Sequence, residues 1–202
     1  MTKFEFFFDC SSPWTYLGFH NVQPIAAEFG VDIIWRPVLV GGIFNGVNDS
    51  VYANRNNPVP SKAIWTGKDL QDWARVSGIT INWPSIFPVN SVKSMRGCFL
   101  AIDAGKLVPY ATRVFEAYWR DDKDISDDLV LAEIVDDVGL DRSAFFDGIA
   151  DPAIKGRFRD TTQEVMDRGG FGSPTMFIND TDMYFGNDRL PLVRDALERL
   201  SR

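Results

Sequence analysis

FEFFFDCSSPWT, at residues 4–15, is the most informative stretch of this chain. The run Phe4–Phe8 is almost continuously apolar, which predicts a buried strand. Ser12 followed by Pro13 is typical of a helix start, because a serine hydroxyl caps the first N–H groups and proline suits the first helical position. We predict a helix from Pro13 to about residue 29 and a second strand at residues 31–36. This order predicts a parallel sheet with a right-handed crossover.

The residues Ser12-Pro13-Trp14-Thr15 stand where a thioredoxin-type redox protein carries its C-x-x-C motif, at the mouth of the first helix. Here both sulfur positions hold hydroxyls, at Ser12 and Thr15. Such a scaffold can still bind a thiol, but it cannot form and reduce a disulfide of its own. The motif therefore predicts a protein that borrows its sulfur from a small molecule.

A second informative segment, FGSPTMF at residues 171–177, places a proline directly before a predicted strand. In thioredoxin-like folds a cis-proline at that point faces the helix mouth. Only about one in twenty X–Pro bonds in folded proteins is cis, so such a bond marks a specific turn. We therefore predict a cis bond at Pro174, opposite Ser12.

The C-terminal part of the chain returns to strand signals. Strands are predicted at residues 175–178 and 183–185, joined by the polar turn at residues 179–182. A last helix is predicted to follow and to end near Leu200, with Asn187 or Asp188 as its cap.

The middle of the chain has a different composition from its ends. Residues 38–66 are rich in glycine, asparagine and proline, which is incompatible with one regular element. Residues 67–167 carry apolar residues at spacings of three and four, which predict several consecutive helices. We predict an α/β fold in which residues 1–66 and 168–202 form a thioredoxin-like domain, and residues 67–167 an inserted all-helical domain.

Within the helical region, Asp127 or Ser126 is expected to cap one helix and Asp141 or Ser143 another. Four tryptophans are expected to lie mostly in the core, with one or two lining an aromatic pocket between the domains. These are Trp65, Trp73, Trp83 and Trp119.

The bulk composition excludes several function classes. A net charge of -7 and a pI near 4.7 argue against a nucleic-acid partner, which requires a basic surface. No apolar run is long enough to cross a membrane, and the N-terminus lacks a signal-peptide pattern, so we expect a cytoplasmic protein. Cys10 and Cys98 form no disulfide framework and are expected to be separate core thiols. No metal site is recognisable.

Ser12 is a poor nucleophile on its own, because serine needs an adjacent base such as histidine. His20, the one histidine, lies two helical turns further on, which disfavours a Ser-His-Asp hydrolase. At a helix start the hydroxyl is better suited to hold a thiolate. Since a hydrogen bond to a charged group contributes about 1.5–3 kcal/mol, we expect Ser12 to lower the pKa of a bound thiol from about 8.5 by about one to two units.

Three segments together resemble bacterial 2-hydroxychromene-2-carboxylate isomerases and the related kappa-class glutathione transferases. They are FFDCSSPWTYL at residues 7–17, FGSPTMF at 171–177 and FGNDRL at 185–190. The resemblance extends over nearly the whole chain, including the inserted helical region. It implies a DsbA-like, kappa-type thioredoxin fold, glutathione as cofactor and a homodimer.

The resemblance also assigns roles to residues. Ser12 matches the catalytic serine that contacts the glutathione sulfur. Ser173 and Pro174 match the segment whose backbone pairs with the cysteinyl part of glutathione. The segment that binds its γ-glutamyl end is matched by Phe185, Gly186, Asn187 and Asp188. From the residues alone, Asn187 and Asp188 are equally well explained as a helix cap.

The long loop matches further contacts by resemblance. Lys62 resembles a lysine that reaches glutathione in the kappa transferases. Asn56 and Asn57 fall where the isomerases place polar substrate contacts, and Phe87 stands where an isomerase offers a tyrosine. Without the resemblance, Lys62 and the two asparagines would be interpreted as solvated loop residues.

The function implied is a glutathione-dependent isomerase that acts on an aromatic, ring-opened pyruvate conjugate by reversible thiolate addition. A kappa-like glutathione S-transferase is the nearest alternative. A non-enzymatic peptide-binding module is a third hypothesis. A thiol-disulfide oxidoreductase is the least favoured, because neither Ser12 nor Thr15 supplies a sulfur atom.

Overall fold

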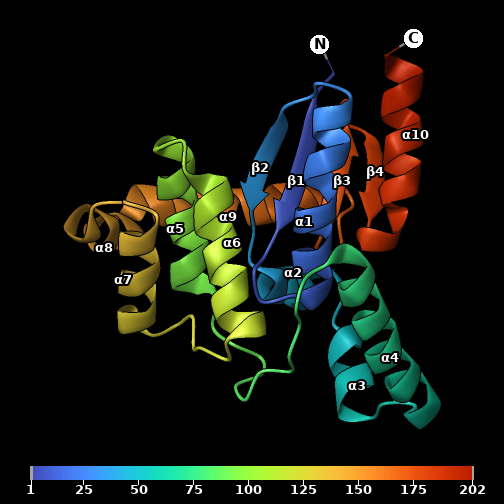
Figure 1. Cartoon of the computed structure of the whole chain (residues 1–202), viewed down its shortest axis with the longest axis horizontal. Helices are drawn as coiled ribbons and strands as arrows, with labels where there is room; N and C mark the ends of the chain where they lie inside the picture. The colour runs from blue at the N-terminus through green and yellow to red at the C-terminus, as the bar shows by residue number, and fades with distance from the viewer. Residues whose placement is uncertain (1, 202) are drawn as a thin grey trace.

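The computed structural model describes residues 2–201 and contains one four-stranded sheet (Figure 1). The strands are β1 (Phe4–Phe8), β2 (Ile33–Pro37), β3 (Thr175–Ile178) and β4 (Asp182–Phe185), in the order β2-β1-β3-β4. β1 pairs with β2 in parallel, while β3 is antiparallel to both of its neighbours. The sheet therefore joins the two ends of the chain, as the sequence predicts for a thioredoxin-like fold.

Strand β1 lies at the centre of the sheet and is buried on both faces. Phe6 and Phe8 pack with Phe19 and other residues of the main core, whereas Phe7 belongs to a second cluster with Ile43 and Phe177. Because side chains alternate along a strand, one run of phenylalanines supplies both cores. This placement holds the end of β1, and the residues that follow it, in a fixed position.

Helix α1 (Pro13–Glu28) covers one face of the sheet, with Ser12 as its N-cap. The Ser12 side chain accepts a hydrogen bond from the N–H of Thr15, and Pro13 occupies the first turn. The predicted strand, helix and parallel strand are thus confirmed, with the second strand beginning two residues later than predicted.

Residues 38–66 are more helical than their composition indicates. They form α2 (Val40–Val47), α3 (Ser50–Asn56) and the first part of α4 (Pro60–Ser77). Two glycines of α2 lie against α9: a Cβ on Gly42 would stand 3.4 Å from the Cγ2 of Thr162, and one on Gly46 only 2.7 Å from the Sδ of Met166. These glycines permit close packing of two helices and do not mark turns.

Helices α3 and α4 project from the rest of the molecule (Figure 1). We call residues 50–69 the arm; all of them are exposed except Val51 and Asp69, which are half-buried. The later part of α4 packs on α1. The predicted domain boundary after residue 66 would therefore divide a continuous helix, and the division into domains stays a prediction.

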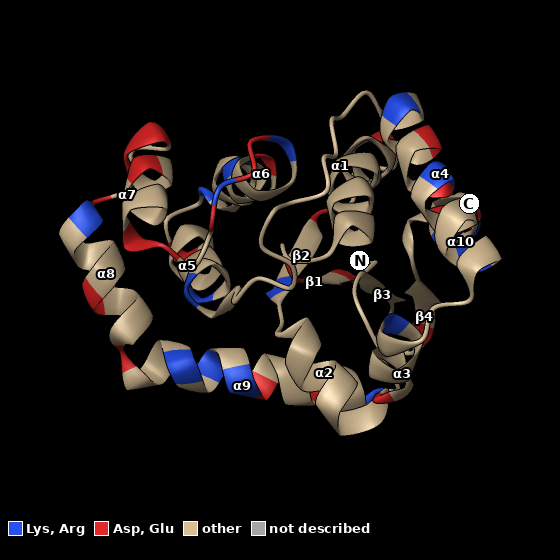
Figure 2. Ribbon diagram, turned by 90° about the horizontal axis from the view of Figure 1, so that it is seen from below, with Lys and Arg blue, Asp and Glu red and all other residues tan. Residues whose placement is uncertain are grey.

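The helical region consists of α5 (Val92–Asp103), α6 (Leu107–Phe115), a π-helical turn (Glu116–Arg120), α7 (Asp128–Asp137), α8 (Arg142–Ala150) and α9 (Pro152–Asp167). Of the alternative caps, Asp127 caps α7 and Asp141 caps α8. Helix α9 extends from α8 back to α2 (Figure 2), so it joins the helical region to the sheet.

At the C-terminus, β4 is followed by a 3-10 turn (Asn187–Arg189) and α10 (Leu190–Leu200). The predicted cap is wrong, because α10 begins without a side-chain cap and Asn187 is turned toward α1. The 3-10 turn separates Asn187 and Asp188 from the N–H groups that they would cap.

Candidate functional site

Ser12 lies opposite the peptide bond that the sequence singles out. The Ser173–Pro174 bond is cis. The Oγ of half-buried Ser12 donates a long hydrogen bond of 3.5 Å to the carbonyl oxygen of Ser173. The two predicted segments, 161 residues apart in the chain, therefore meet at the mouth of α1.

The other hydroxyl of the motif has a structural partner. Thr15 is buried, and its Oγ1 shares a hydrogen bond of 2.8 Å with the Oγ of Ser173. The same Ser173 oxygen accepts the N–H of Asp9 at 3.0 Å. These bonds fasten the cis-proline loop to the end of β1, so Ser12 is the hydroxyl of the pair that remains available to a ligand.

Asp9 is a buried carboxylate directly behind this site, and sequence analysis missed it. Its oxygens accept hydrogen bonds from the N–H of Ser11 (2.9 Å), the N–H of Val40 (2.8 Å) and the Oγ of Ser91 (3.1 Å). Burial raises the pKa of Asp9, and these three hydrogen bonds oppose that rise. One side chain thus links the end of β1 to the starts of α2 and α5, and fixes the entry to α1.

Neither cysteine is placed to act as a nucleophile. Cys10 and Cys98 are free and fully buried, as predicted. Burial, followed by contact with the Cys98 thiol, raises the pKa of Cys10 well above its usual value, which suppresses the reactive thiolate.

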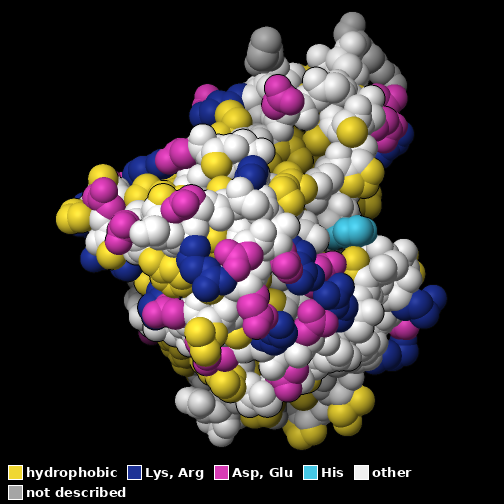
Figure 3. Space-filling model, turned by 60° about the vertical axis from the view of Figure 1, so that its left-hand side comes forward, with side chains coloured by type: hydrophobic (Ala, Val, Ile, Leu, Met, Phe, Trp, Pro, Cys, Tyr) yellow, Lys and Arg dark blue, Asp and Glu magenta, His cyan; other side chains and the backbone are white. Residues whose placement is uncertain are grey.

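His20 is exposed on α1 and is the single cyan side chain in Figure 3. No hydrogen bond of the described residues joins it to Ser12, so the hydrolase geometry is not present. Residues 2–201 also contain no group of three His, Cys, Asp or Glu side chains that could hold a metal ion.

Two groups of aromatic rings are connected to the Ser12 loop and the cis-proline loop. In the first group, a Cβ added to Gly172, next to Ser173, would stand 2.8 Å from the ring of Phe185 and 3.8 Å from that of Phe44. Phe171 packs against Phe185 with 4.4 Å between ring centroids. The rings of Phe44, Phe171 and Phe185 form what we call the first wall.

In the second group Phe87, at the cis Phe87–Pro88 bond, packs against Trp83 (4.7 Å between ring centroids) and Trp119 (6.3 Å). Trp119 is fully buried and donates its Nε1–H to the carbonyl of Cys10 at 2.9 Å. These three rings form the second wall, which places the predicted substrate residue Phe87 two contacts from the Ser12 loop. The expectation for Trp119 is confirmed, but Trp83 is 64% exposed and Trp65, on the arm, is also exposed.

The predicted glutathione segment lies beside the cis-proline. Phe185 pairs with Thr175, and the N–H of Gly186 donates to the carbonyl of Pro174 at 3.1 Å. Asn187 is buried; its Oδ1 accepts from Asn21 in α1, but its Nδ2 has no partner among the described residues.

Asp188 is exposed and pairs with Arg189. Its side chain is therefore reachable by a ligand at the end of β4. The structure thus brings one set of predicted residues together around Ser12, namely Ser173, Pro174, Phe185, Gly186 and Asn187, with Asp188 next to them.

Other predicted residues lie on the arm. Asn56 ends α3, Asn57 follows it, and Lys62 is in the first turn of α4. All three side chains are exposed, and no described contact links them to Ser12. Their roles stay predictions. Arg55, beside Asn56, was not predicted, although it reaches both aromatic walls.

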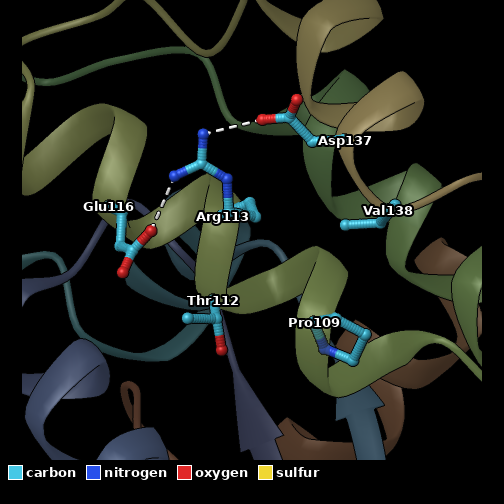
Figure 4. Close-up of a pocket in the computed structure, with 6 residues that line it drawn as sticks. All are labelled: Pro109, Thr112, Arg113, Glu116, Asp137 and Val138. Atoms are coloured by element: carbon cyan, nitrogen blue, oxygen red, sulfur yellow. Dashed lines mark hydrogen bonds and ion pairs between the residues drawn. The ribbon is translucent and has the colours of Figure 1, made fainter.

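A hollow of about 660 Å³ lies elsewhere, in the helical region (Figure 4). Its one cation, Arg113, already pairs with Glu116 and Asp137, each at 2.8 Å. Arg113 and both carboxylates are thus already partnered, so this hollow lacks the unpartnered groups that mark the Ser12 site.

Comparisons with known proteins agree with this geometry. A family model described as a DSBA-like thioredoxin domain matches residues 3–198. The chain is 30% identical to 2-hydroxychromene-2-carboxylate isomerase of Pseudomonas putida, over 98% of this chain and 95% of that protein. It is 26% identical to glutathione S-transferase kappa 1 of Homo sapiens, over 96% and 89% of the two chains.

Among solved structures, a 2-hydroxychromene-2-carboxylate isomerase superposes with a TM-score of 0.87 at 29% identity. The match covers 98% of this chain and 96% of that one.

Proposed function

Since this chain belongs to the DsbA-like thioredoxin family, in the group of 2-hydroxychromene-2-carboxylate isomerases and kappa-class glutathione transferases, we propose that it is a glutathione-dependent isomerase. The substrate pair proposed is 2-hydroxychromene-2-carboxylate and its ring-opened form, trans-o-hydroxybenzylidenepyruvate. The observation that carries the proposal is the Ser12 hydroxyl at the mouth of α1, facing a cis-proline loop with no cysteine in the motif.

Ser12 suits the task of stabilising a thiolate. Its hydrogen bond to the Ser173 carbonyl is long, at 3.5 Å, and therefore weak. Little free energy is lost when the hydroxyl group gives up this bond and donates to a sulfur anion instead. The start of α1 adds a favourable field for negative charge. Glutathione, when bound, supplies a thiolate that adds to the conjugated double bond and is released unchanged after rotation.

The neighbouring residues fit a small peptide. Among the described residues, the Ser173 carbonyl accepts only the long bond from Ser12, which leaves it accessible to a ligand N–H. The Nδ2 of Asn187 is buried without an acceptor, an arrangement that costs free energy unless a ligand supplies one. Asp188 offers an exposed carboxylate for the ammonium group of a γ-glutamyl end.

A kappa-like glutathione transferase is the second candidate, favoured by the human kappa relative. In a transferase the sulfur remains attached to the product, so free thiol is consumed. In an isomerase the total thiol is unchanged after many turnovers. Titration of thiol before and after reaction distinguishes the two.

We also propose a cytoplasmic homodimer. No helix of residues 2–201 is both long and apolar enough to span a membrane. The arm exposes Ile64 (75%) and Trp65 (61%) to solvent, and apolar side chains grouped in this way commonly mark an interface. Sedimentation of the wild type and Trp65→Ser tests this, with a dimer expected for the first and a monomer for the second.

The central experiment is an absorbance assay with 2-hydroxychromene-2-carboxylate, with and without glutathione. We expect glutathione-dependent equilibration by the wild type and a large loss in Ser12→Ala. Equilibration that does not respond to glutathione would contradict the proposed role of the cofactor, and no equilibration at all would contradict the isomerase function.

A further inference from the structure

Arg55 differs from most arginines of this protein in lacking a carboxylate partner. Arginines such as Arg113, Arg120, Arg157 and Arg168 each bind an Asp or Glu side chain within 3.1 Å. No ion pair of the described residues includes Arg55, although the chain carries 28 Asp and Glu residues. Its guanidinium lies instead over two aromatic rings, with its Cζ 5.5 Å from the centroid of Phe44 and 5.3 Å from that of Phe87.

The two rings belong to the two different walls and are connected to the Ser12 site through different residues. Phe44 lies beside Gly172, the residue before Ser173, in the first wall. Phe87 packs on Trp119 in the second wall, and Trp119 is hydrogen-bonded to the carbonyl of Cys10, two residues before Ser12. Arg55 therefore spans from one wall to the other, and it is the cation that the arm brings to the aromatic surface.

This placement suits an anionic group on an aromatic ligand. Two ring faces restrain the planar guanidinium while leaving its N–H edges without protein acceptors, and a guanidinium fork matches a carboxylate in bidentate geometry. The protein as a whole carries a net charge of -7, so an anionic ligand needs a local cation. Because Arg55 contacts both walls, it is the cation available to a carboxylate on an aryl group that packs against either of them.

We propose that Arg55 binds the carboxylate of the substrate and makes the site select aryl α-keto acids over the corresponding ketones. This assignment rests on the proposed function, because it concerns the same site. It adds a specificity-determining residue on α3 that acts at the end of the substrate remote from Ser12.

The test measures ligand binding directly, through quenching of tryptophan fluorescence, so that it does not depend on turnover. The probes are trans-o-hydroxybenzylidenepyruvate and its methyl ketone analogue, trans-o-hydroxybenzylideneacetone, which lacks the carboxylate. For Arg55→Gln we expect the Kd of the keto acid to rise about tenfold to a hundredfold and that of the methyl ketone to change less than about twofold. Arg55→Lys keeps the positive charge but not the forked guanidinium geometry. Its Kd for the keto acid should lie between those of Arg55→Gln and the wild type.

Arg75→Gln is the matched control, since it removes the same charge from an exposed arginine on α4 and should leave both constants unchanged. Equal weakening of both probes by Arg55→Gln would overturn the proposal and assign Arg55 to the packing of α3. Unchanged keto-acid binding in Arg55→Gln, or none to the wild type, would also overturn it. If the wild type binds the keto acid selectively but shows no glutathione-dependent turnover, the proposed function fails while the role of Arg55 stands.

Discussion

The end of β1 and the arm both border the candidate site, but they are held in place by different kinds of contact. At the end of β1, the carboxylate of Asp9 and the hydroxyls of Thr15 and Ser173 are buried and hydrogen-bonded to backbone and side chains. The arm is exposed almost throughout, and α3 is attached to α2 through ring and side-chain contacts of Tyr52 and Arg55.

This difference indicates a division of labour. A group that stabilises a developing charge must be fixed before the substrate arrives, because reorganisation during the reaction costs free energy. A group that receives the remote end of a substrate tolerates motion, and loosely packed segments often carry that task. In the roles proposed above, Ser12 belongs to the first kind and Arg55 to the second.

At the end of β1, the largest effect is expected from Asp9→Ala. The substitution leaves three donors, from Ser11, Val40 and Ser91, without an acceptor in a buried place. We expect the free energy of unfolding to fall by about 3 kcal/mol, measured by urea denaturation. Asp103→Ala, which removes an exposed ion pair with Arg157, is the control and should cost less than about 1 kcal/mol. Equal losses in the two variants would refute the idea that the buried bonds of Asp9 hold the end of β1 more firmly than a surface ion pair holds its helices.

Ser12→Ala should affect activity more than stability. If Ser12 holds a thiolate as proposed, the loss of that hydrogen bond predicts a fall in kcat/KM of about tenfold to a hundredfold. The lost helix cap should cost only about 1 kcal/mol of unfolding free energy. Steady-state kinetics and urea denaturation measure the two quantities. Thr15→Val loses the hydrogen bond to Ser173 and should lower the unfolding free energy more than kcat/KM. Similar losses of activity and stability in both variants would contradict the separate roles proposed for the two hydroxyls.

Much of the region around Ser12 was predictable because its signals are local. A serine before a proline, an apolar run and a proline before a strand each act on their own neighbours, and the structure places all three as predicted. Asp9 was missed because its partners Val40 and Ser91 lie 31 and 82 residues away. A charged residue directly after an apolar strand was the one available signal.

The region from residue 38 to the arm was predicted less well. Its glycines were interpreted as turn residues, yet Gly46 allows α2 to pack closely on Met166 of α9, a contact 120 positions further along the chain. Arg55 could not be selected from sequence, since what distinguishes it is the lack of an acidic partner and the proximity of Phe44 and Phe87. Tertiary contacts, which local composition does not report, decide both cases.

The titration of Asp9 provides a smaller effect that probes the same buried site. Burial raises the pKa of Asp9 in the folded protein, so its contribution to stability is full below the unfolded value, about 3.9, and is lost as the pH rises through the folded value. Each unit by which the pKa is raised corresponds to about 1.4 kcal/mol.

We therefore expect the difference in unfolding free energy between the wild type and Asp9→Asn to shrink as the pH rises from about 4 and then to level off. Urea denaturation of both proteins across this range gives the difference. A difference that grows with pH would mean that the hydrogen bonds from Ser11, Val40 and Ser91 outweigh burial and lower the pKa.

The smallest effect is expected from Ile64→Ala on the arm, and Ile43→Ala on α2 is its matched control. Ile43 is fully buried on α2, so its truncation leaves a cavity and should lower the unfolding free energy by about 2–5 kcal/mol. Ile64 is 75% exposed, and its truncation should stay within about 0.5 kcal/mol of the wild type at concentrations where sedimentation shows a monomer. If Ile64→Ala were to destabilise the monomer as much as Ile43→Ala, the arm would have to pack on the body of the molecule. The contrast between a firmly held end of β1 and a loosely held arm would then be lost.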